Sequence, residues 1–156
     1  MDQEGLAVSA RGTVAAGHTV TVGDAAAPGR AVLARSLGRR GEDYAARWLR
    51  ERGFAVVAAN WRSRRGELDL VALDPGTAEL VGVEVKTRGG TGFGFPAEAV
   101  TAQKLARLHR LVADFARSEA GEAWARCPRR VDVLALVWPP GAALPASVEH
   151  YRAVIP

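Results

Sequence analysis

The chain has 156 residues, a formal net charge of +4 and 48% hydrophobic residues, which fits one soluble domain with a sizeable core. The small basic excess suits an anionic partner such as nucleic acid but does not require one. The single cysteine, Cys127, excludes an internal disulfide and a cysteine-built zinc site, and it suits a reducing compartment. No uncharged run is apolar over the roughly 18 residues of a membrane span. We therefore expect a cytoplasmic protein with no membrane segment.

Composition changes along the chain. Residues 1–35 are rich in alanine and glycine and contain no aromatic residue, so they offer little apolar surface to offset the entropy lost on ordering. We predict a flexible N-terminal tail there. Residues 36–156 carry all the aromatic residues and the whole net charge, and we predict that they form one domain.

The first predicted elements are a helix and a strand. Residues 36–52 repeat apolar side chains with the helical period, and Gly53 supplies a stop. Residues 54–59 are apolar and include two valines, which favours a strand. Residues 60–66, NWRSRRG, predict a basic loop.

A hairpin and a loop are predicted next. Two apolar runs, 68–73 and 80–85, predict neighbouring strands, because the turn sequence Asp-Pro-Gly at 74–76 lies between them. The glycine-rich residues 89–96 then predict a mobile loop.

The last third of the domain predicts a helix and two strands. Thr101 is expected to cap the helix. The buried face of that helix is predicted to consist of Leu108, Leu111, Val112 and Phe115. Residues 131–138 predict a further strand, and residues 148–155 a last edge strand. The order of helix, three strands, helix and strand predicts an α/β fold with a mixed central sheet flanked by helices.

Charged residues lie at the ends of the two hairpin strands. Glu67 and Asp69 are two residues apart, as are Glu84 and Lys86, and alternate strand residues share a face. We therefore predict that the hairpin brings the four side chains into one compact site. Close carboxylates repel one another unless a cation lies between them, and their oxygens suit Mg²⁺ or Mn²⁺ better than zinc. The competing interpretation is a surface ladder of Glu–Lys pairs.

Lysine is rare in this chain. Only Lys86 and Lys104 occur among 21 basic residues, and a compact ammonium approaches water or phosphate as a planar guanidinium does not. Lys104 is predicted to point toward the buried side of its helix near the N-terminus, where the dipole disfavours a cation, so an anion is expected beside it. The alternative is a lysine that extends past an apolar stripe to solvent.

Glu42 lies on or beside the inward face of the first predicted helix. It is a candidate for a further metal ligand that reaches over the sheet. The alternative is a carboxylate near the helix N-terminus, stabilised by the dipole and by Arg39 or Arg40.

Five blocks of the sequence occur in this order: LGRRGEDYAARWLRERGF, NWRSRRGELDLVA, VGVEVKTR, FGFPAEAVTAQKLARL and RRVDVLAL. Together they resemble the YraN-like family of small predicted bacterial endonucleases. That family is related to Holliday-junction resolvases within the PD-(D/E)xK nuclease superfamily. The resemblance implies a restriction-endonuclease-like αβββαβ core.

The resemblance also implies roles for the charged residues. Asp69, Glu84 and Lys86 match the catalytic Asp, Glu and Lys of the superfamily, and Glu42 matches a carboxylate of the first helix. Glu67 matches the Glu of the family's Gly-Glu-hydrophobic-Asp pattern.

Three further positions follow from the resemblance. Lys104 matches a lysine of the second helix. Asp132 matches an Asp after that helix, for which structural and catalytic roles are both open. Gly82 departs from the family, which often has a bulky Phe there, so looser packing is expected at this point of the strand.

We expect a metal-dependent endonuclease that hydrolyses phosphodiester bonds in DNA and selects structure rather than sequence. Asp69, Glu84, the carbonyl of Val85 and Glu42 would hold Mg²⁺ or Mn²⁺, and Lys86 would orient the attacking water.

Nucleic-acid contacts are expected from basic residues around this site. They are Arg62, Arg64, Arg65, Arg88 and Lys104. DNA is expected rather than RNA, and a homodimer would suit an enzyme that cuts two strands. The alternative function is a nucleic-acid-binding accessory protein that keeps the fold and does not cleave.

Overall fold

The computed structural model describes residues 29–90 and 100–156. Its elements, in chain order, are α1 (Arg30–Glu51), β1 (Ala55–Ser63), β2 (Gly66–Asp74), β3 (Glu79–Arg88), α2 (Ala102–Arg117), the 3-10 helix η2 (Glu119–Trp124), β4 (Arg129–Val137) and β5 (Ser147–Tyr151). The predicted tail up to residue 28, and the predicted mobile loop from residue 91 onward, lie outside the described residues. Neither described α-helix combines the length and the apolar content needed to cross a bilayer.

The five strands form one sheet in the order β1-β2-β3-β4-β5. Neighbouring strands are antiparallel except β3 and β4, which run parallel. A parallel pair needs a crossover connection, and α2 lies between these two strands in the chain. The predicted α/β fold, a mixed sheet flanked by helices and compatible with an αβββαβ core, is therefore confirmed.

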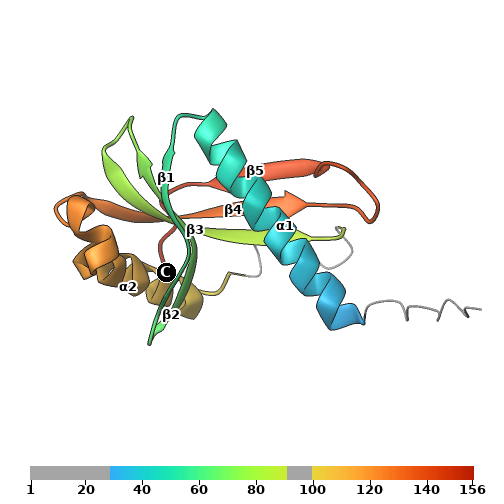
Figure 1. The fold of residues 1–156 in the computed structure, drawn as a ribbon, viewed down its shortest axis with the longest axis horizontal. Helices are drawn as coiled ribbons and strands as arrows, with labels where there is room; N and C mark the ends of the chain where they lie inside the picture. The colour runs from blue at the N-terminus through green and yellow to red at the C-terminus, as the bar shows by residue number, and fades with distance from the viewer. Residues whose placement is uncertain (1–28, 91–99) are drawn as a thin grey trace, which may run out of the picture.

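The two helices cover opposite faces of the sheet (Figure 1). On one face, Leu49 of α1 packs in a core with Val83 of β3. On the other, Phe115 of α2 packs in a core with Leu80 of β3, and all four residues predicted for the buried face of this helix are buried. Burying one such side chain stabilises the fold by about 1.5–3 kcal/mol, so the sheet is held from both sides.

Two glycines allow the helices to approach β3 closely. A Cβ on Gly41 of α1 would lie 1.9 Å from Thr87 Oγ1, and a Cβ on Gly82 of β3 would lie 2.2 Å from Val112 Cγ2. The side chain of Val112 in α2 therefore fills the space beside Gly82. The expectation of looser packing at Gly82 is wrong.

The first helix is longer than predicted. It begins at Arg30 rather than at residue 36, and its first turns leave Val32 and Leu33 exposed. The apolar stripe of a helix packed on a core is missing there, which is why periodicity indicates too late a start. The end is as predicted, because Gly53 follows the helix with φ of 86°.

The first strand also extends further than predicted. β1 continues to Ser63, and Arg62 pairs with Glu67 of β2 across the hairpin. The predicted loop 60–66 is therefore wrong except at its centre: residues 60–63 belong to β1, Gly66 begins β2, and only Arg64 and Arg65 form the turn. Exposed cross-strand pairs of opposite charge are compatible with a strand, so polarity alone is a poor guide.

A buried charge cluster lies near the β2–β3 turn. Arg130 donates hydrogen bonds to Asp74 at 2.8 Å and to Asp132 at 2.9 Å. Asp132 is fully buried and also accepts from the main-chain nitrogen of Ala153 at 2.9 Å, while His150 Nε2 lies 2.9 Å from its other oxygen. Both oxygens of Asp132 are thus engaged in holding the C-terminal segment, which is a structural role.

Candidate functional site

The candidate site forms where β2 and β3 stop pairing. Their ladder ends at the pair Leu70↔Val83. One residue earlier in β2, the carboxylate of Asp69 accepts a hydrogen bond from Val85 N at 2.8 Å. The Asp69 side chain thus accepts the hydrogen bond of the Val85 amide, which would pair with a main-chain carbonyl if the ladder continued. This bond fixes the Asp69 carboxylate between the two strands.

The alternation of β2 breaks at Asp69. Leu68 packs in the core beneath α2 and Leu70 in the core beneath α1, although residues two apart in a regular strand share a face. That Glu67 and Asp69 share one face stays a prediction, and both carboxylates lie within electrostatic reach of Glu42 of α1. Glu67 lines a cavity beside α1, whereas Asp69 interacts electrostatically with Glu84.

Asp69 and Glu84 form a largely buried carboxylate pair. Burial and the charge of Glu84 raise the pKa of Asp69 to about 7, and the charge of Glu42 adds to the rise. The hydrogen bond from Val85 and the charge of Lys104 oppose it. The ionised form of Asp69 is therefore disfavoured, first by burial and then by the neighbouring carboxylate, as expected for close carboxylates with no cation between them.

Lys104 of α2 supplies a positive charge beside Glu84. The Oγ1 of Thr101 accepts a hydrogen bond from Lys104 N at 3.2 Å and caps the helix, as predicted. The Lys104 ammonium forms an ion pair with Glu84, whose side chain is only 8% exposed. The prediction that Lys104 faces an anion is confirmed. This ion pair neutralises Glu84 and leaves Asp69 without a direct cationic partner among the described residues.

Lys86 follows Glu84 on the same face of β3. Val83 and Val85 pack beneath α1, so the residues that alternate with them face α2. Lys86 is half-buried, and its ammonium makes no ion pair or hydrogen bond within the described parts of the chain. It is thus an uncommitted cation two residues from the carboxylate pair.

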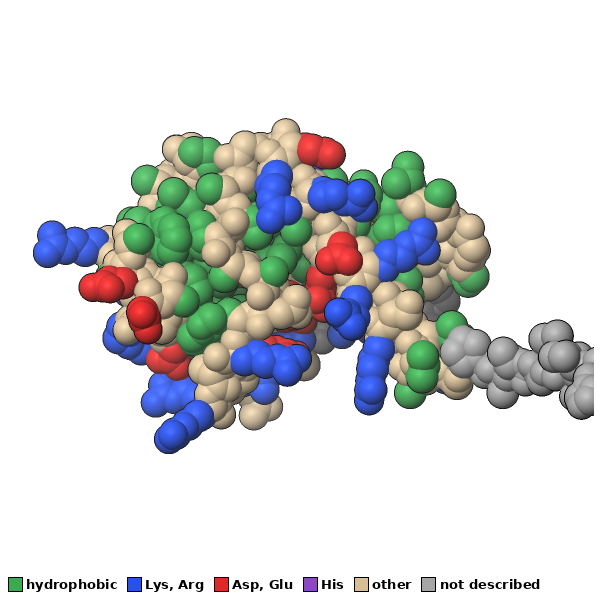
Figure 2. Space-filling view, in the orientation of Figure 1, with side chains coloured by type: hydrophobic (Ala, Val, Ile, Leu, Met, Phe, Trp, Pro, Cys, Tyr) green, Lys and Arg blue, Asp and Glu red, His purple; other side chains and the backbone are tan. Residues whose placement is uncertain are grey.

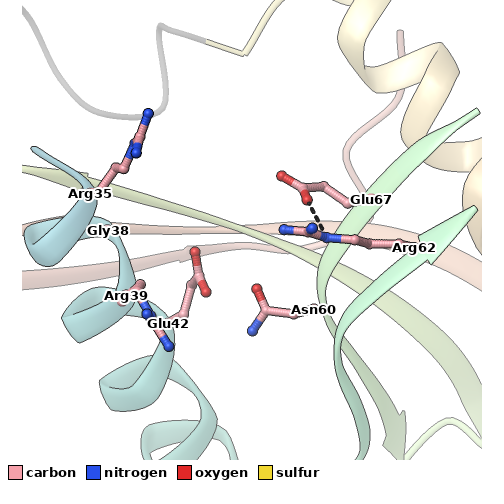
Figure 3. A pocket seen from close by; sticks show the side chains of 7 residues that line it. All are labelled: Arg35, Gly38, Arg39, Glu42, Asn60, Arg62 and Glu67. Carbon is pink, nitrogen blue, oxygen red and sulfur yellow. Dashed lines mark ion pairs between the residues drawn. The ribbon is translucent and has the colours of Figure 1, made fainter. Parts of the chain in front are cut away.

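A cavity of about 580 Å³ lies between α1 and the β1–β2 hairpin (Figure 3). Glu42 projects from α1 toward Asn60 of β1, and Arg62 pairs with Glu67 on the opposite wall at 3.1 Å. Burial raises the pKa of Glu42 although the neighbouring Asn60 side chain lowers it, and the charge of Glu67 adds to the rise. The cavity therefore contains a second carboxylate whose ionisation is disfavoured.

Glu42 lies in the middle of α1, because the helix begins earlier than predicted. Its stabilisation by the dipole of a helix N-terminus is therefore excluded. Arg39 lowers its pKa, while Arg40 donates instead to main-chain carbonyls that follow β4. The charge of Glu42 also raises the pKa of Asp69. Glu42 therefore lines the cavity and interacts electrostatically with the carboxylate pair.

Asn60 is a site residue that sequence reasoning missed. It has φ of 52° within β1, and its side chain lines the cavity with Glu42 and lowers the pKa of that carboxyl. Asn is among the few non-glycine residues that adopt this left-handed conformation. An Asn after an apolar strand is therefore a signal for a local irregularity, although the same signal also fits the start of a loop.

The predicted metal ligands are not gathered into one cluster. In the described parts of the chain, no three His, Cys, Asp or Glu side chains surround a common metal position. Val85 presents its N–H to Asp69. The donor chemistry nevertheless fits a divalent ion. The hard carboxylate oxygens of Asp69 and Glu84 suit Mg²⁺ or Mn²⁺, and a cation would offset the charge of Glu84, which together with burial raises the pKa of Asp69.

The predicted nucleic-acid contacts differ in environment. Arg62 is exposed and paired with Glu67, and Arg65 pairs with Asp114 of α2 at 3.3 Å. Arg64 is exposed in the turn. The Nε of Arg88 is buried and has no hydrogen-bond partner among the described residues.

Sequence comparisons identify one family. Residues 41–136 match the model described as "Uncharacterised protein family UPF0102". The chain is 47% identical to a UPF0102 protein of Clavibacter michiganensis subsp. michiganensis over 118 residues. This alignment covers 76% of this chain and 94% of that protein. It is 50% identical over 119 residues to a UPF0102 protein of Beutenbergia cavernae, which covers 76% of this chain and 95% of that protein. A relative from Frankia alni is 48% identical over 117 residues, 75% of this chain and 92% of its own length. The matched residues include the carboxylate site and the strands that build it. The chain therefore belongs to UPF0102, an uncharacterised protein family.

Proposed function

We propose that the chain is a metal-dependent endonuclease, which hydrolyses phosphodiester bonds in DNA and selects structure rather than base sequence. The observation that supports this proposal is the largely buried Asp69–Glu84 pair, with Lys86 two residues beyond Glu84 on the same face of β3. The Lys86 ammonium forms no ion pair with another described residue. A protein that only bound a polyanion would gain nothing from close carboxylates, because without a cation they repel phosphate. A cation that joined the two carboxylates would remove the repulsion.

The residues of this chain would divide the work as follows. Asp69 and Glu84 would hold Mg²⁺ or Mn²⁺, with Glu42 within electrostatic reach of Asp69. When bound, a divalent ion supplies charge stabilisation for the phosphate and lowers the pKa of a water. The N–H of Val85 keeps the Asp69 carboxylate oriented. Lys86 would orient the attacking water and stabilise negative charge on the phosphate oxygens.

A second candidate is a nucleic-acid-binding protein that does not cleave. The observation that favours it is the ion pair between Lys104 and Glu84, which already neutralises one of the two carboxylates. A protein that used this ion pair only to stabilise the fold would bind nucleic acid without divalent metal.

Cleavage assays separate these functions. Labelled single strands, duplexes, flaps and four-way junctions would be incubated with the protein in Mg²⁺ or Mn²⁺, beside Asp69→Ala and Lys86→Ala. Glu122→Ala is the control, because Glu122 is exposed in η2. We expect metal-dependent cleavage by the wild type and the control, and a loss of about 100-fold or more in both site variants.

If no DNA is cut, calorimetric measurement of Mn²⁺ binding distinguishes an enzyme with another substrate from a protein that only binds nucleic acid. Metal binding that disappears in Asp69→Ala would support the metal site and direct attention to other substrates. The absence of both cleavage and metal binding would reject the enzyme and leave the binding protein.

A further inference from the structure

We infer that basic side chains of α1, β1 and α2 line one continuous groove that binds the phosphate backbone of a nucleic-acid strand without reading its bases. The inference rests on the proposed function for the identity of the polyanion, and it adds contacts on both sides of the carboxylate pair. We call this surface the arginine groove. Its basic residues are Arg35, Arg39, Arg62, Lys104, Arg107 and Arg110.

The groove is continuous because three cavities share lining residues. The cavity between α1 and the hairpin shares Arg62 and Glu67 with a second cavity of about 420 Å³ at the hairpin tip. The second cavity shares Arg107 with a third, of about 340 Å³, along the first turns of α2. Arg107 lies against the hairpin, since a Cβ on Gly66 would be 3.7 Å from its Nε.

Two charged neighbours of the carboxylate pair line this groove, one at each end. Arg39 occupies the same cavity as Glu42 on the α1 side, and the charge of Glu42 reaches Asp69. On the α2 side, Lys104 lines the third cavity and forms an ion pair with Glu84. Neither Asp69 nor Glu84 lines any of the three cavities, so the groove approaches the carboxylate pair through Glu42 at one end and Lys104 at the other.

Most arginines of the groove form no ion pair with another described residue, although the charge of Arg39 acts on Glu42. Arg35, Arg39, Arg107 and Arg110 form no ion pair within the described parts of the chain. By contrast, Arg65 and Arg117 are both paired with Asp114. Figure 2 shows basic side chains along α1 with a few carboxylates between them.

The lining residues indicate what part of a nucleic acid would be recognised. Among the described residues that line the three cavities, none is aromatic, so no side chain is available there to stack on a base. Arginine and lysine contacts to phosphate position a strand and carry no sequence information. The groove is therefore suited to a polyphosphate backbone of any sequence.

The test is DNA binding by the full chain, measured by fluorescence anisotropy in a chelator so that cleavage does not interfere. The probes are single-stranded and duplex DNA of two unrelated sequences, over a salt series. One variant, Arg35→Gln with Arg39→Gln, removes two positive charges from the α1 side of the groove. A second, Arg107→Gln with Arg110→Gln, removes two from the α2 side.

The control variant is Arg47→Gln with Arg50→Gln. Both residues are exposed on α1 and line none of the three cavities, so the control removes the same charge from outside the groove. Circular dichroism and thermal melting would establish that all three variants fold.

We expect each groove variant to weaken binding about tenfold at moderate salt. The slope of log K against log salt should become shallower by about 0.7–0.9 for each phosphate that the variant no longer neutralises. The two sequences should give equal affinities, and the control should match the wild type. Equally weakened binding in the control and groove variants, a strong preference for one sequence, or no DNA binding by the wild type would each overturn the inference.

The DNA-binding test and the cleavage test distinguish the failure of the groove from the failure of the proposed enzyme. Cleavage by a protein whose groove variants bind and cut normally would retain the enzyme and reject the groove. DNA binding that is weakened only in the groove variants, in a protein that neither cleaves DNA nor binds metal, would retain the groove and reject the enzyme.

Discussion

The carboxylate of Asp69 accepts a hydrogen bond from the main-chain nitrogen of Val85 at 2.8 Å, in the position where a β-ladder would otherwise continue. The bond favours the ionised form of Asp69, whereas burial and the neighbouring Glu84 disfavour it more strongly. The fold thus orients a carboxylate at a point where its charge is unfavourable. Such arrangements are frequent at functional sites, where stability is lost to keep a group ready for a ligand.

The first prediction concerns Asp69 and pH. Its pKa rises from the ordinary value of 3.8 to about 7 in the fold, so the folded state binds more protons than the unfolded chain between these values. The free energy of unfolding should therefore fall as pH rises from about 4 to about 7. Asp69→Asn keeps an oxygen for Val85 N and removes the charge. We expect it to stabilise the protein by about 2 kcal/mol at pH 8 in a chelator, and the gain to vanish near pH 4.

Urea denaturation across this pH range measures the effect. Asp43→Asn is the matched control, because Asp43 is exposed on α1. A gain for Asp69→Asn that did not depend on pH would contradict the electrostatic explanation.

The second prediction concerns competition for Glu84. Lys104 forms an ion pair with this carboxylate, so a divalent ion has to share Glu84 with the ammonium or displace it. Lys104→Met keeps the apolar stem and removes the charge. We expect Mn²⁺ to bind about 3- to 10-fold more tightly to this variant than to the wild type, because a nearby cation is removed. Calorimetry at low ionic strength measures the affinity.

Arg117→Met controls for a general change of net charge, since Arg117 is exposed and lies in the last turn of α2. Unchanged or weaker Mn²⁺ binding in Lys104→Met would show that the ammonium does not compete with the metal. Asp69→Ala should lose the binding altogether.

The third prediction concerns the buried charge cluster. Arg130 is 6% exposed and donates to Asp74 and Asp132, so Arg130→Met would remove the buried cation that these two buried carboxylates share. Asp74 would keep its ion pair with the half-exposed Arg152, and Asp132 its contact with His150. We expect a loss of about 3–5 kcal/mol in the free energy of unfolding at neutral pH. The exposed pair of Arg117 with Asp114 should be worth less than about 1 kcal/mol in the parallel Arg117→Met measurement.

The pH dependence of this cluster has the opposite sign to that of Asp69. Burial opposes the ionisation of Asp132, but hydrogen bonds from His150 and Arg130 outweigh it and lower its pKa below 3.8. The stability that it contributes is therefore present above the unfolded value and is lost as pH falls through the folded value. Arg130→Met should flatten the acid limb of the stability curve, and an unchanged acid limb would exclude this account.

The fourth prediction concerns the contact of β3 with α2. A Cβ on Gly82 would lie 2.2 Å from Val112 Cγ2, so Gly82→Ala should destabilise the fold by about 1–3 kcal/mol through overpacking. Val112→Ala removes the clashing methyl groups. The double variant should be more stable than the sum of the two single losses by at least about 0.5 kcal/mol, measured in a double-mutant cycle. Simple additivity would mean that the helix moves away instead.

Much of the architecture was readable from local sequence. The Asp-Pro-Gly turn predicted the β2–β3 hairpin, and Thr101 predicted the start of α2, because turn and capping preferences act over a few residues. The apolar stripe of α2 identified its buried face, since helical periodicity reports one face directly. The position of Lys104 on that stripe also indicated that an anion would lie beside it.

Other features depended on residues far apart in the chain. Strand alternation predicts Glu67 and Asp69 on one face, provided that it continues through β2. In the fold it breaks at Asp69, where the Val85 amide of another strand binds the carboxylate. Local spacing carries no information about such a bond.

The sequence by itself therefore determined the elements, their order and the residue types available for chemistry. Only the tertiary structure decided which of these residues meet. It paired Glu84 with Lys104, placed Glu42 with Asn60 in the cavity beside α1, and left Asp69 as the carboxylate with the raised pKa. The physical reason is that periodicity and capping are short-range, whereas burial and charge–charge interactions depend on which elements pack together.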